Sequence, residues 1–162
     1  MKTPMRGAIL ALTVATLALA IVLVCDPAPS TVEDWPQASI RIDGEWVDVR
    51  IAKTSRTRSQ GFQHATPEQI RSEKILFIWP DQRQPSFHME NVACPLVIAW
   101  IADGTIVATE HMKPGRALYR PPQPVDAALE LHPERAEDLG IKSGTEIDLS
   151  RDDPRDSGAD PP

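Results

Sequence analysis

Residues 96–110, LVIAWIADGTIVATE, decide the fold class of this chain. The unbroken apolar run over 96–102 is typical of a strand that is buried on both faces. Asp103-Gly104 follows it, a dipeptide that favours the tight turn of a β-hairpin. A second strand is expected over 105–110, so the stretch predicts a β-hairpin whose first strand is buried.

Further strand signals lie on both sides of this hairpin. Residues 39–43 and 46–51 alternate polar and apolar side chains, which predicts a second hairpin. The remaining expected strands are 75–79, 125–131 and 145–149. Many short strands joined by brief connections are typical of a mainly β fold.

Short helices are expected over 55–60 and 133–139, because each stretch has a suitable first turn and ends at a glycine. Thr66-Pro67-Glu68 is suited to open a further helical turn. We therefore predict a small β-sandwich or open barrel with two short helices, preceded by one N-terminal transmembrane helix.

That transmembrane helix is expected within residues 1–25. Lys2 and Arg6 precede an uncharged apolar run over 7–24, GAILALTVATLALAIVLV. As a helix this run would span roughly 27 Å, close to the thickness of the hydrocarbon core of a bilayer. Because the positive charges precede it, the N-terminus stays in the cytoplasm. We expect a single-pass inner-membrane protein whose C-terminal domain lies in the periplasm or otherwise outside the cytoplasm.

Two alternatives to an uncleaved anchor stay open. Ala18-Leu19-Ala20 fits the cleavage site of a signal peptide, although four more apolar residues follow it. Cys25 has the depth of a lipidated cysteine, although the preceding Val24 is bulky. All three interpretations deliver the rest of the chain outside the cytoplasm. We expect Cys25 and Cys94 to be unpaired, because one lies at the membrane boundary and the other within the domain.

The rest of the chain divides into three parts. Residues 26–37 are Pro-rich and acidic and predict a linker. Residues 38–149 carry the strand signals and predict one extracytoplasmic β domain, whereas 150–162, SRDDPRDSGADPP, predict a disordered tail. The formal net charge of −6 argues against a nucleic-acid-binding protein, which would carry a basic surface. We expect a monomer that contacts the membrane through residues 7–24, with a protein or small-molecule partner of unknown identity.

Several short motifs occur in a distinctive order. The chain reads RTRSQGFQ over 56–63, ILFIW over 75–79, FHMENV over 87–92 and GIKSG over 140–144. In this order they resemble the domain of unknown function 192 family, over about residues 40–149. The resemblance implies a β fold and places a site near 87–92. It implies no chemistry, because the family has no agreed activity.

The chain resembles a divergent member of that family. Gln63 stands where the family pattern has Met, His88 where it has Trp, Glu90 where it has Lys, Val92 where it has Thr and Val97 where it has Asp. A family activity that depends on that Asp or Thr would therefore be lost in this chain.

The segment 87–91 is the leading site candidate. Polar side chains on a loop that is stiffened by neighbouring prolines are typical of binding sites, and the segment is too short and mixed for a regular strand. Its candidate binding residues are His88, Met89, Glu90 and Asn91. Asn91 fits a structural turn residue equally well.

Glu130 and Arg58 complete the candidate pocket. Glu130 alternates with Leu129 and Leu131, which places it on the opposite face of its strand. We expect the Glu130 carboxylate to face solvent or to pair with Arg58. The alternative is a carboxylate that lines the pocket beside His88.

Two His-Met pairs raise the question of a metal. His88-Met89 and His111-Met112 combine imidazole and thioether, ligands that suit copper. Adjacent strand residues point to opposite faces, however, and Met usually fills a core. We expect no metal and no cofactor, with copper at these four residues as the alternative.

No catalytic signature is visible, since the chain lacks G-x-S-x-G, H-E-x-x-H, C-x-x-C and phosphate-loop motifs. We therefore expect a membrane-anchored extracytoplasmic binding or accessory domain of unknown ligand. The alternative is a small envelope enzyme, hydrolase-like or metal-dependent, that uses His88, Glu90 and Glu130. A third interpretation is a structural envelope protein whose Pro-rich tail recruits a partner.

Overall fold

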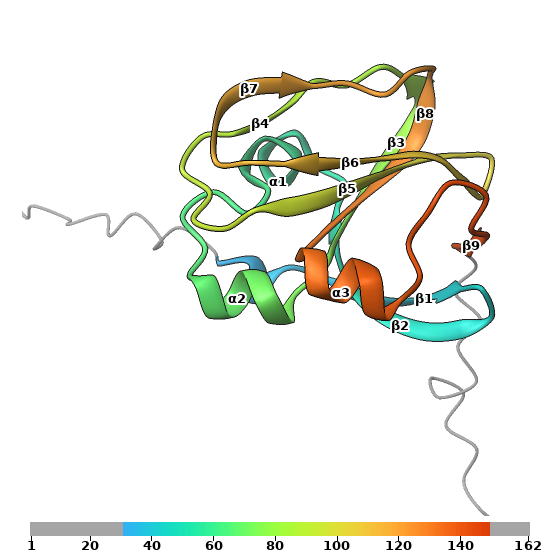
Figure 1. The fold of residues 1–162 in the computed structure, drawn as a ribbon, viewed down its shortest axis with the longest axis horizontal. Coiled ribbons are helices and arrows are strands. Elements are labelled where there is room, and N and C mark those ends of the chain that lie inside the picture. Colours follow the sequence, from blue (N-terminus) through green and yellow to red (C-terminus); the bar gives the residue numbers. More distant parts are fainter. Residues whose placement is uncertain (1–30, 150–162) are drawn as a thin grey trace, which may run out of the picture.

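A computed structural model describes residues 31–149, which fold around one curled seven-stranded sheet (Figure 1). Its strands are β1 (Gln37–Ile42), β2 (Glu45–Ala52), β3 (Ile75–Arg83), β5 (Leu96–Ala102), β6 (Thr105–Met112), β8 (Val125–Leu131) and β9 (Ile147–Asp148). They lie in the order β6-β5-β8-β3-β2-β1-β9, and all neighbours are antiparallel except β2 and β3. The expected hairpin over 96–110 forms β5 and β6.

Backbone hydrogen bonds link the two ends of this sheet. The N–H of Ile106 donates to the carbonyl of Thr145 (2.9 Å), and the N–H of Gly144 donates to the carbonyl of Ile106 (2.8 Å). The N–H of Ile147 donates to the carbonyl of Gly104 (2.8 Å). The approach to β9 is thus held against β6, and the sheet curls into a half-barrel. The expected mainly β fold is confirmed, with the open barrel as its form.

Three short α-helices connect the strands: α1 (Ser55–Gln60), α2 (Pro67–Ser72) and α3 (Pro133–Asp138), and a 3-10 turn, η1 (Val32–Asp34), precedes β1. Thr54 and Thr66 begin α1 and α2 by accepting hydrogen bonds on their hydroxyls from the N–H groups of Thr57 (3.1 Å) and Gln69 (3.2 Å). The single turn expected at 66–68 is therefore a complete helix.

The expected transmembrane helix and disordered tail lie outside the described residues. Within 31–149, no helix is long and apolar enough to span a bilayer.

Apolar residues pack on both faces of the sheet. One cluster includes Ile42, Ile101 and Leu129, and the other includes Phe62, Phe77 and Trp100. β5 is buried at every position, as its unbroken apolar run predicts. β8 lies between β5 and β3, and it is also covered on both faces.

The folded domain begins before residue 38. Val32 and Trp35 are 2% and 4% exposed, and both belong to the cluster that includes Phe62. Gln37 already starts β1, and the carbonyl of Pro36 accepts a hydrogen bond from Ile51 (2.8 Å). The linker expected over 26–37 is therefore corrected from residue 31 onward. The Pro-rich, acidic composition of this segment gave no indication that Val32 and Trp35 belong to the core.

A two-stranded ribbon, formed by β4 (Phe87–Met89) and β7 (Gly115–Tyr119), lies above α1 in Figure 1. The expectation of a loop over 87–91 is wrong for its first three residues. Phe87 pairs with Tyr119, and Met89 pairs with Gly115. A strand of three residues shows no usable periodicity, so only its distant partner reveals it.

Candidate ligand-binding pocket

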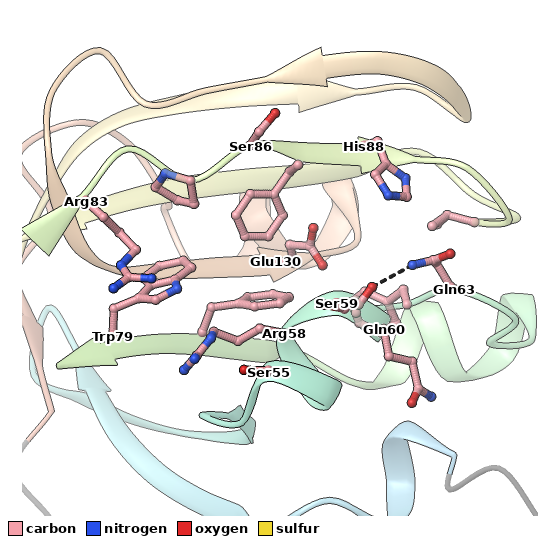
Figure 2. Close-up of a pocket in the computed structure, with 16 residues that line it drawn as sticks. Ser55, Arg58, Ser59, Gln60, Gln63, Trp79, Arg83, Ser86, His88 and Glu130 are labelled. Carbon is pink, nitrogen blue, oxygen red and sulfur yellow. Dashed lines mark hydrogen bonds between the residues drawn. The ribbon is translucent and has the colours of Figure 1, made fainter. Parts of the chain in front are cut away.

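A pocket of about 380 Å³ lies between α1, β3 and β4, with Glu130 of β8 at its floor (Figure 2). The residues that line it are Ser55, Arg58, Ser59, Gln60, Gly61, Phe62, Gln63, Phe77, Trp79, Arg83, Pro85, Ser86, Phe87, His88, Val92 and Glu130. Among these lining residues, Glu130 alone carries a carboxyl group. The pocket therefore combines one acidic group with aromatic rings, hydroxyls and amides.

Glu130 is buried, with 3% of its surface exposed. Alternation along β8 does put it on the face opposite Leu129 and Leu131, as the sequence predicts. That face is covered by α1 and β4, so the expectation of a solvent-facing carboxylate is wrong. The alternative interpretation, a carboxyl group that lines the pocket, describes its position.

Burial raises the pKa of Glu130 to about 8. A neighbouring cation would oppose this shift, but Arg58 is engaged elsewhere. Its guanidinium donates to the carbonyls of Lys53 (2.6 Å) and Ile78 (3.0 Å), and Figure 2 shows it directed away from the Glu130 carboxyl. The expected Glu130–Arg58 pair is therefore wrong. With this pKa, the Glu130 carboxyl is mostly protonated at neutral pH.

Gly61 keeps space open beside that carboxyl. It ends α1 with φ +51°, a conformation that favours glycine. A Cβ at this position would lie 3.5 Å from Oε2 of Glu130 and 3.6 Å from Cζ of Phe77. A larger side chain at residue 61 would therefore fill the floor of the pocket.

Aromatic rings form the wall above Glu130. The ring of Phe87 stands edge-to-face with Phe77 at 4.9 Å, with Trp79 at 6.2 Å and with Trp100 at 5.3 Å between centroids. Phe87 therefore fixes β4 against the sheet, and the neighbouring His88 is held at the rim of the pocket.

His88 is exposed at this rim, and its Nδ1 accepts a hydrogen bond from the backbone N–H of Glu90 (3.3 Å). In the neutral ring the proton therefore lies on Nε2. Thus Arg58, His88 and Glu130 are brought together on one pocket, although they contribute different chemistry to it.

The other three sequence candidates lie elsewhere. Met89 is 1% exposed and belongs to the core. Glu90 accepts a hydrogen bond from Arg116 (2.9 Å) at the surface. Asn91 has φ +60°, and its carbonyl accepts from the N–H of His64 (2.9 Å). Asn91 is therefore a turn residue, the structural alternative that its residue type suggested.

The copper alternative gains no support from the arrangement of the His-Met pairs. His88 and His111 are exposed, whereas Met89 and Met112 are at most 1% exposed. Each pair thus points to opposite faces of its strand. Over residues 31–149, no group of three His, Cys, Asp or Glu side chains is placed to hold a metal ion.

Sequence reasoning missed most of the pocket wall. Ser59, Gln63 and Arg83 line it but were not among the candidate binding residues. A usable signal was the set of departures from the family pattern, because Gln63, His88 and Val92 all lie on the wall. Val97, another departure, is instead buried on the opposite face of the sheet.

A second hollow, of about 500 Å³, lies on the other side of the turn 59–63 and is bordered by Val32. Its wall is more apolar, and Arg56 and His64 at its edge are exposed. It holds no buried ionisable group, so it offers less chemistry than the Glu130 pocket.

The model of one protein family, DUF192 (Uncharacterized ACR), matches residues 38–149. The chain belongs to the DUF192 family. A candidate transcription regulator from Sinorhizobium meliloti has a similar structure, with TM-score 0.62 and 25% identity, over 70% of this chain and 94% of that one. The fold is also similar to that of a protein of unknown function from Novosphingobium aromaticivorans, with TM-score 0.63 and 22% identity, over 77% of this chain and 94% of that one. Among curated proteins, no match is found.

The side chains of His88 and Glu90 are expected to contribute little to stability. His88→Ala and Glu90→Ala should each change the free energy of unfolding by less than about 0.5 kcal/mol, because both side chains are solvated and the Glu90–Arg116 pair is at the surface. Urea unfolding of the two variants checks this. A loss of 1 kcal/mol or more, roughly the cost of an unsatisfied buried group, would show that the side chain is structural.

Proposed function

We propose that this chain is a membrane-anchored extracytoplasmic ligand-binding domain, with the Glu130 pocket as its binding site. One observation carries this proposal. A carboxyl group that is 3% exposed lies at the floor of an open pocket without a cationic partner among residues 31–149. Burying an ionisable carboxyl group without a partner lowers the stability of the fold. Carboxyl groups in pockets whose pKa values are strongly shifted occur preferentially at functional sites.

The pocket supports binding better than hydrolysis. A hydrolase of the serine type needs a nucleophile within hydrogen-bond reach of a base. Within the described residues, neither Glu130 nor His88 forms a hydrogen bond with Ser55 or Ser59. Glu90, which the enzyme alternative also required, pairs with Arg116 outside the pocket.

An acid–base enzyme is the second candidate, and the pKa of Glu130 favours it. A carboxyl group whose pKa is about 8 can hold a proton at neutral pH and donate it to a bound substrate. Turnover of a ligand that binds the pocket, abolished by Glu130→Gln, would favour this candidate over simple binding.

A thermal-shift screen tests the binding proposal on the full chain in detergent micelles. Compounds that raise the melting temperature of the unaltered chain should lose this effect in Glu130→Gln. They should keep it in Glu90→Gln, the matched control, because Glu90 is a partly solvated carboxylate that pairs with Arg116 outside the pocket. Compounds that stabilise both variants equally would bind elsewhere and contradict the proposed site.

The anchor is tested separately. Because the uncharged run 7–24 follows Lys2 and Arg6, a C-terminal reporter that works only outside the cytoplasm should be active. The protein should also stay in the membrane fraction after a carbonate wash. A soluble, N-terminally shortened product would favour a cleaved signal peptide. Palmitate labelling that is lost in Cys25→Ala would favour a lipoprotein.

A further inference from the structure

We infer that the ligand of the Glu130 pocket is a small organic cation, an alkylamine or alkylguanidine, whose charged group pairs with Glu130 beside Phe77 and Phe87. This inference rests on the proposed binding function and names its ligand class. It follows from the charges, the aromatic wall and the space around one carboxyl group.

The first step concerns charge. Glu130 contributes the only carboxyl on the wall, and its surface is 97% covered by the fold. Arg58 reaches the same pocket, but two backbone carbonyls hold its guanidinium. The fold therefore supplies no partner for an ionised Glu130 among the described residues. A cationic ligand would supply that partner, because its charged group can donate a charge-assisted hydrogen bond to the buried carboxylate.

The second step concerns the basic side chains on the wall, which are Arg58 on α1, Arg83 at the end of β3 and His88 on β4. Arg83 and His88 are exposed, so solvent and salt screen their repulsion of a cation. The buried carboxyl is screened far less, because it lies away from solvent. The half-buried guanidinium of Arg58 is held by two backbone carbonyls and directed away from Glu130 (Figure 2), so attraction to Glu130 dominates at the floor of the pocket.

The third step concerns shape. Phe77, Trp79 and Phe87 line the pocket together with Glu130, and the π-face of an aromatic ring attracts a cation. Gly61 has no side chain beside Oε2 of Glu130, so a group as small as an ammonium can approach this oxygen. A volume of about 380 Å³ accommodates a short alkyl chain behind the charged group.

Binding of a cation must release a proton. With the pKa of Glu130 at about 8, the empty pocket holds a protonated carboxyl at pH 7. The O–H bond breaks, the proton leaves to solvent, and the carboxylate then pairs with the ligand. About 0.9 proton should be released per ligand at pH 7, and the affinity should rise about tenfold between pH 7 and pH 9.

Four short alkyl probes that differ in their polar head group test the inference: n-butylamine, n-butylguanidine, n-butanol and butyrate. Each is titrated into the ¹⁵N-labelled full chain in detergent micelles, and the amide shifts around the pocket are followed. We expect the two cations to bind at least tenfold more tightly than butanol or butyrate. Calorimetry in two buffers of different ionisation enthalpy should detect the released proton, a measurement that needs no variant.

Variants locate the effect. Glu130→Gln should remove the preference for cations and the pH dependence of binding, and its amide spectrum shows whether it is folded. Glu90→Gln should leave both unchanged. His88→Asn should keep the tenfold rise between pH 7 and pH 9, because this rise follows the ionisation of Glu130.

Each contrary result has a distinct meaning. Pocket shifts with butanol or butyrate that equal or exceed those with the cations would overturn the ligand class and leave a binding pocket. Cation binding without proton release, or unchanged in Glu130→Gln, would overturn the role of Glu130. Absence of pocket shifts with all four probes would overturn the inference. The broader thermal-shift screen then decides separately whether the pocket binds any ligand.

Discussion

The Glu130→Gln variant should lose most of the decline in stability that the unaltered chain shows between pH 5 and pH 9. The pKa of Glu130 is about 8 in the folded chain, whereas an unfolded Glu has a pKa near 4.3. The folded state thus holds this proton more tightly. Its stabilising contribution is complete below about pH 4 and is lost as the pH rises to 8. The loss amounts to about 5 kcal/mol in total. Gln does not ionise, so it keeps the stability of the neutral form.

Urea unfolding of the full chain at pH 5, 7 and 9 measures this difference. Glu90→Gln serves as the control and should show the same decline as the unaltered chain, because its carboxylate is partly solvated at the surface. Parallel pH profiles for Glu130→Gln and the unaltered chain would show that the carboxyl is hydrated in solution. The charge argument for a cationic ligand would then fail as well.

Trp35→Ala should destabilise the domain by about 3–5 kcal/mol, the usual cost of removing a large buried aromatic side chain. Trp35 is 4% exposed and packs in the cluster that includes Phe62 and Val32. Its ring Nε1 is buried without a hydrogen-bond partner in the part of the chain that the structure describes. Trp35→Phe is therefore a suitable control, since it keeps an aromatic ring and removes that unsatisfied N–H.

We expect Trp35→Phe to unfold close to the unaltered chain in urea and Trp35→Ala to unfold at a much lower concentration. A fragment that begins at Ala38 should resemble Trp35→Ala, because it lacks both Val32 and Trp35. Normal stability of that fragment would mean that residues 31–37 are not part of the cooperative core, and the boundary suggested by composition would be restored.

Local sequence patterns were sufficient to predict most strands of the sheet. The apolar run of β5 and the Asp103-Gly104 turn specify their hairpin without outside help. Glu130 is an example of what local patterns cannot predict. Alternation predicts which face of β8 carries Glu130, but that face is covered by α1, a helix about seventy residues earlier in the chain. A contact between segments so far apart leaves no pattern in the sequence around Glu130. The burial of Glu130 by α1, and the engagement of Arg58 with backbone carbonyls, therefore could not be predicted from local patterns.

The segment 87–91 also depends on a distant contact, its pairing in the ribbon formed by β4 and β7. Polar composition identified His88 as a pocket residue, yet it grouped His88 with Met89 and Glu90. The strand geometry of β4 separates these neighbours, because it turns Met89 into the core and leaves His88 at the rim. Only the pairing of β4 with the distant β7 establishes that geometry.

The two-residue strand β9 has a consequence for how the protein behaves in concentrated solution. β9 pairs with β1, and the residues just before it bond to β6, so one short segment protects two strand edges at once. Unprotected edges are templates on which another chain can add a strand. Truncation or a fusion that displaces residues 144–148 would open both edges together and convert a self-contained domain into one that aggregates edge to edge.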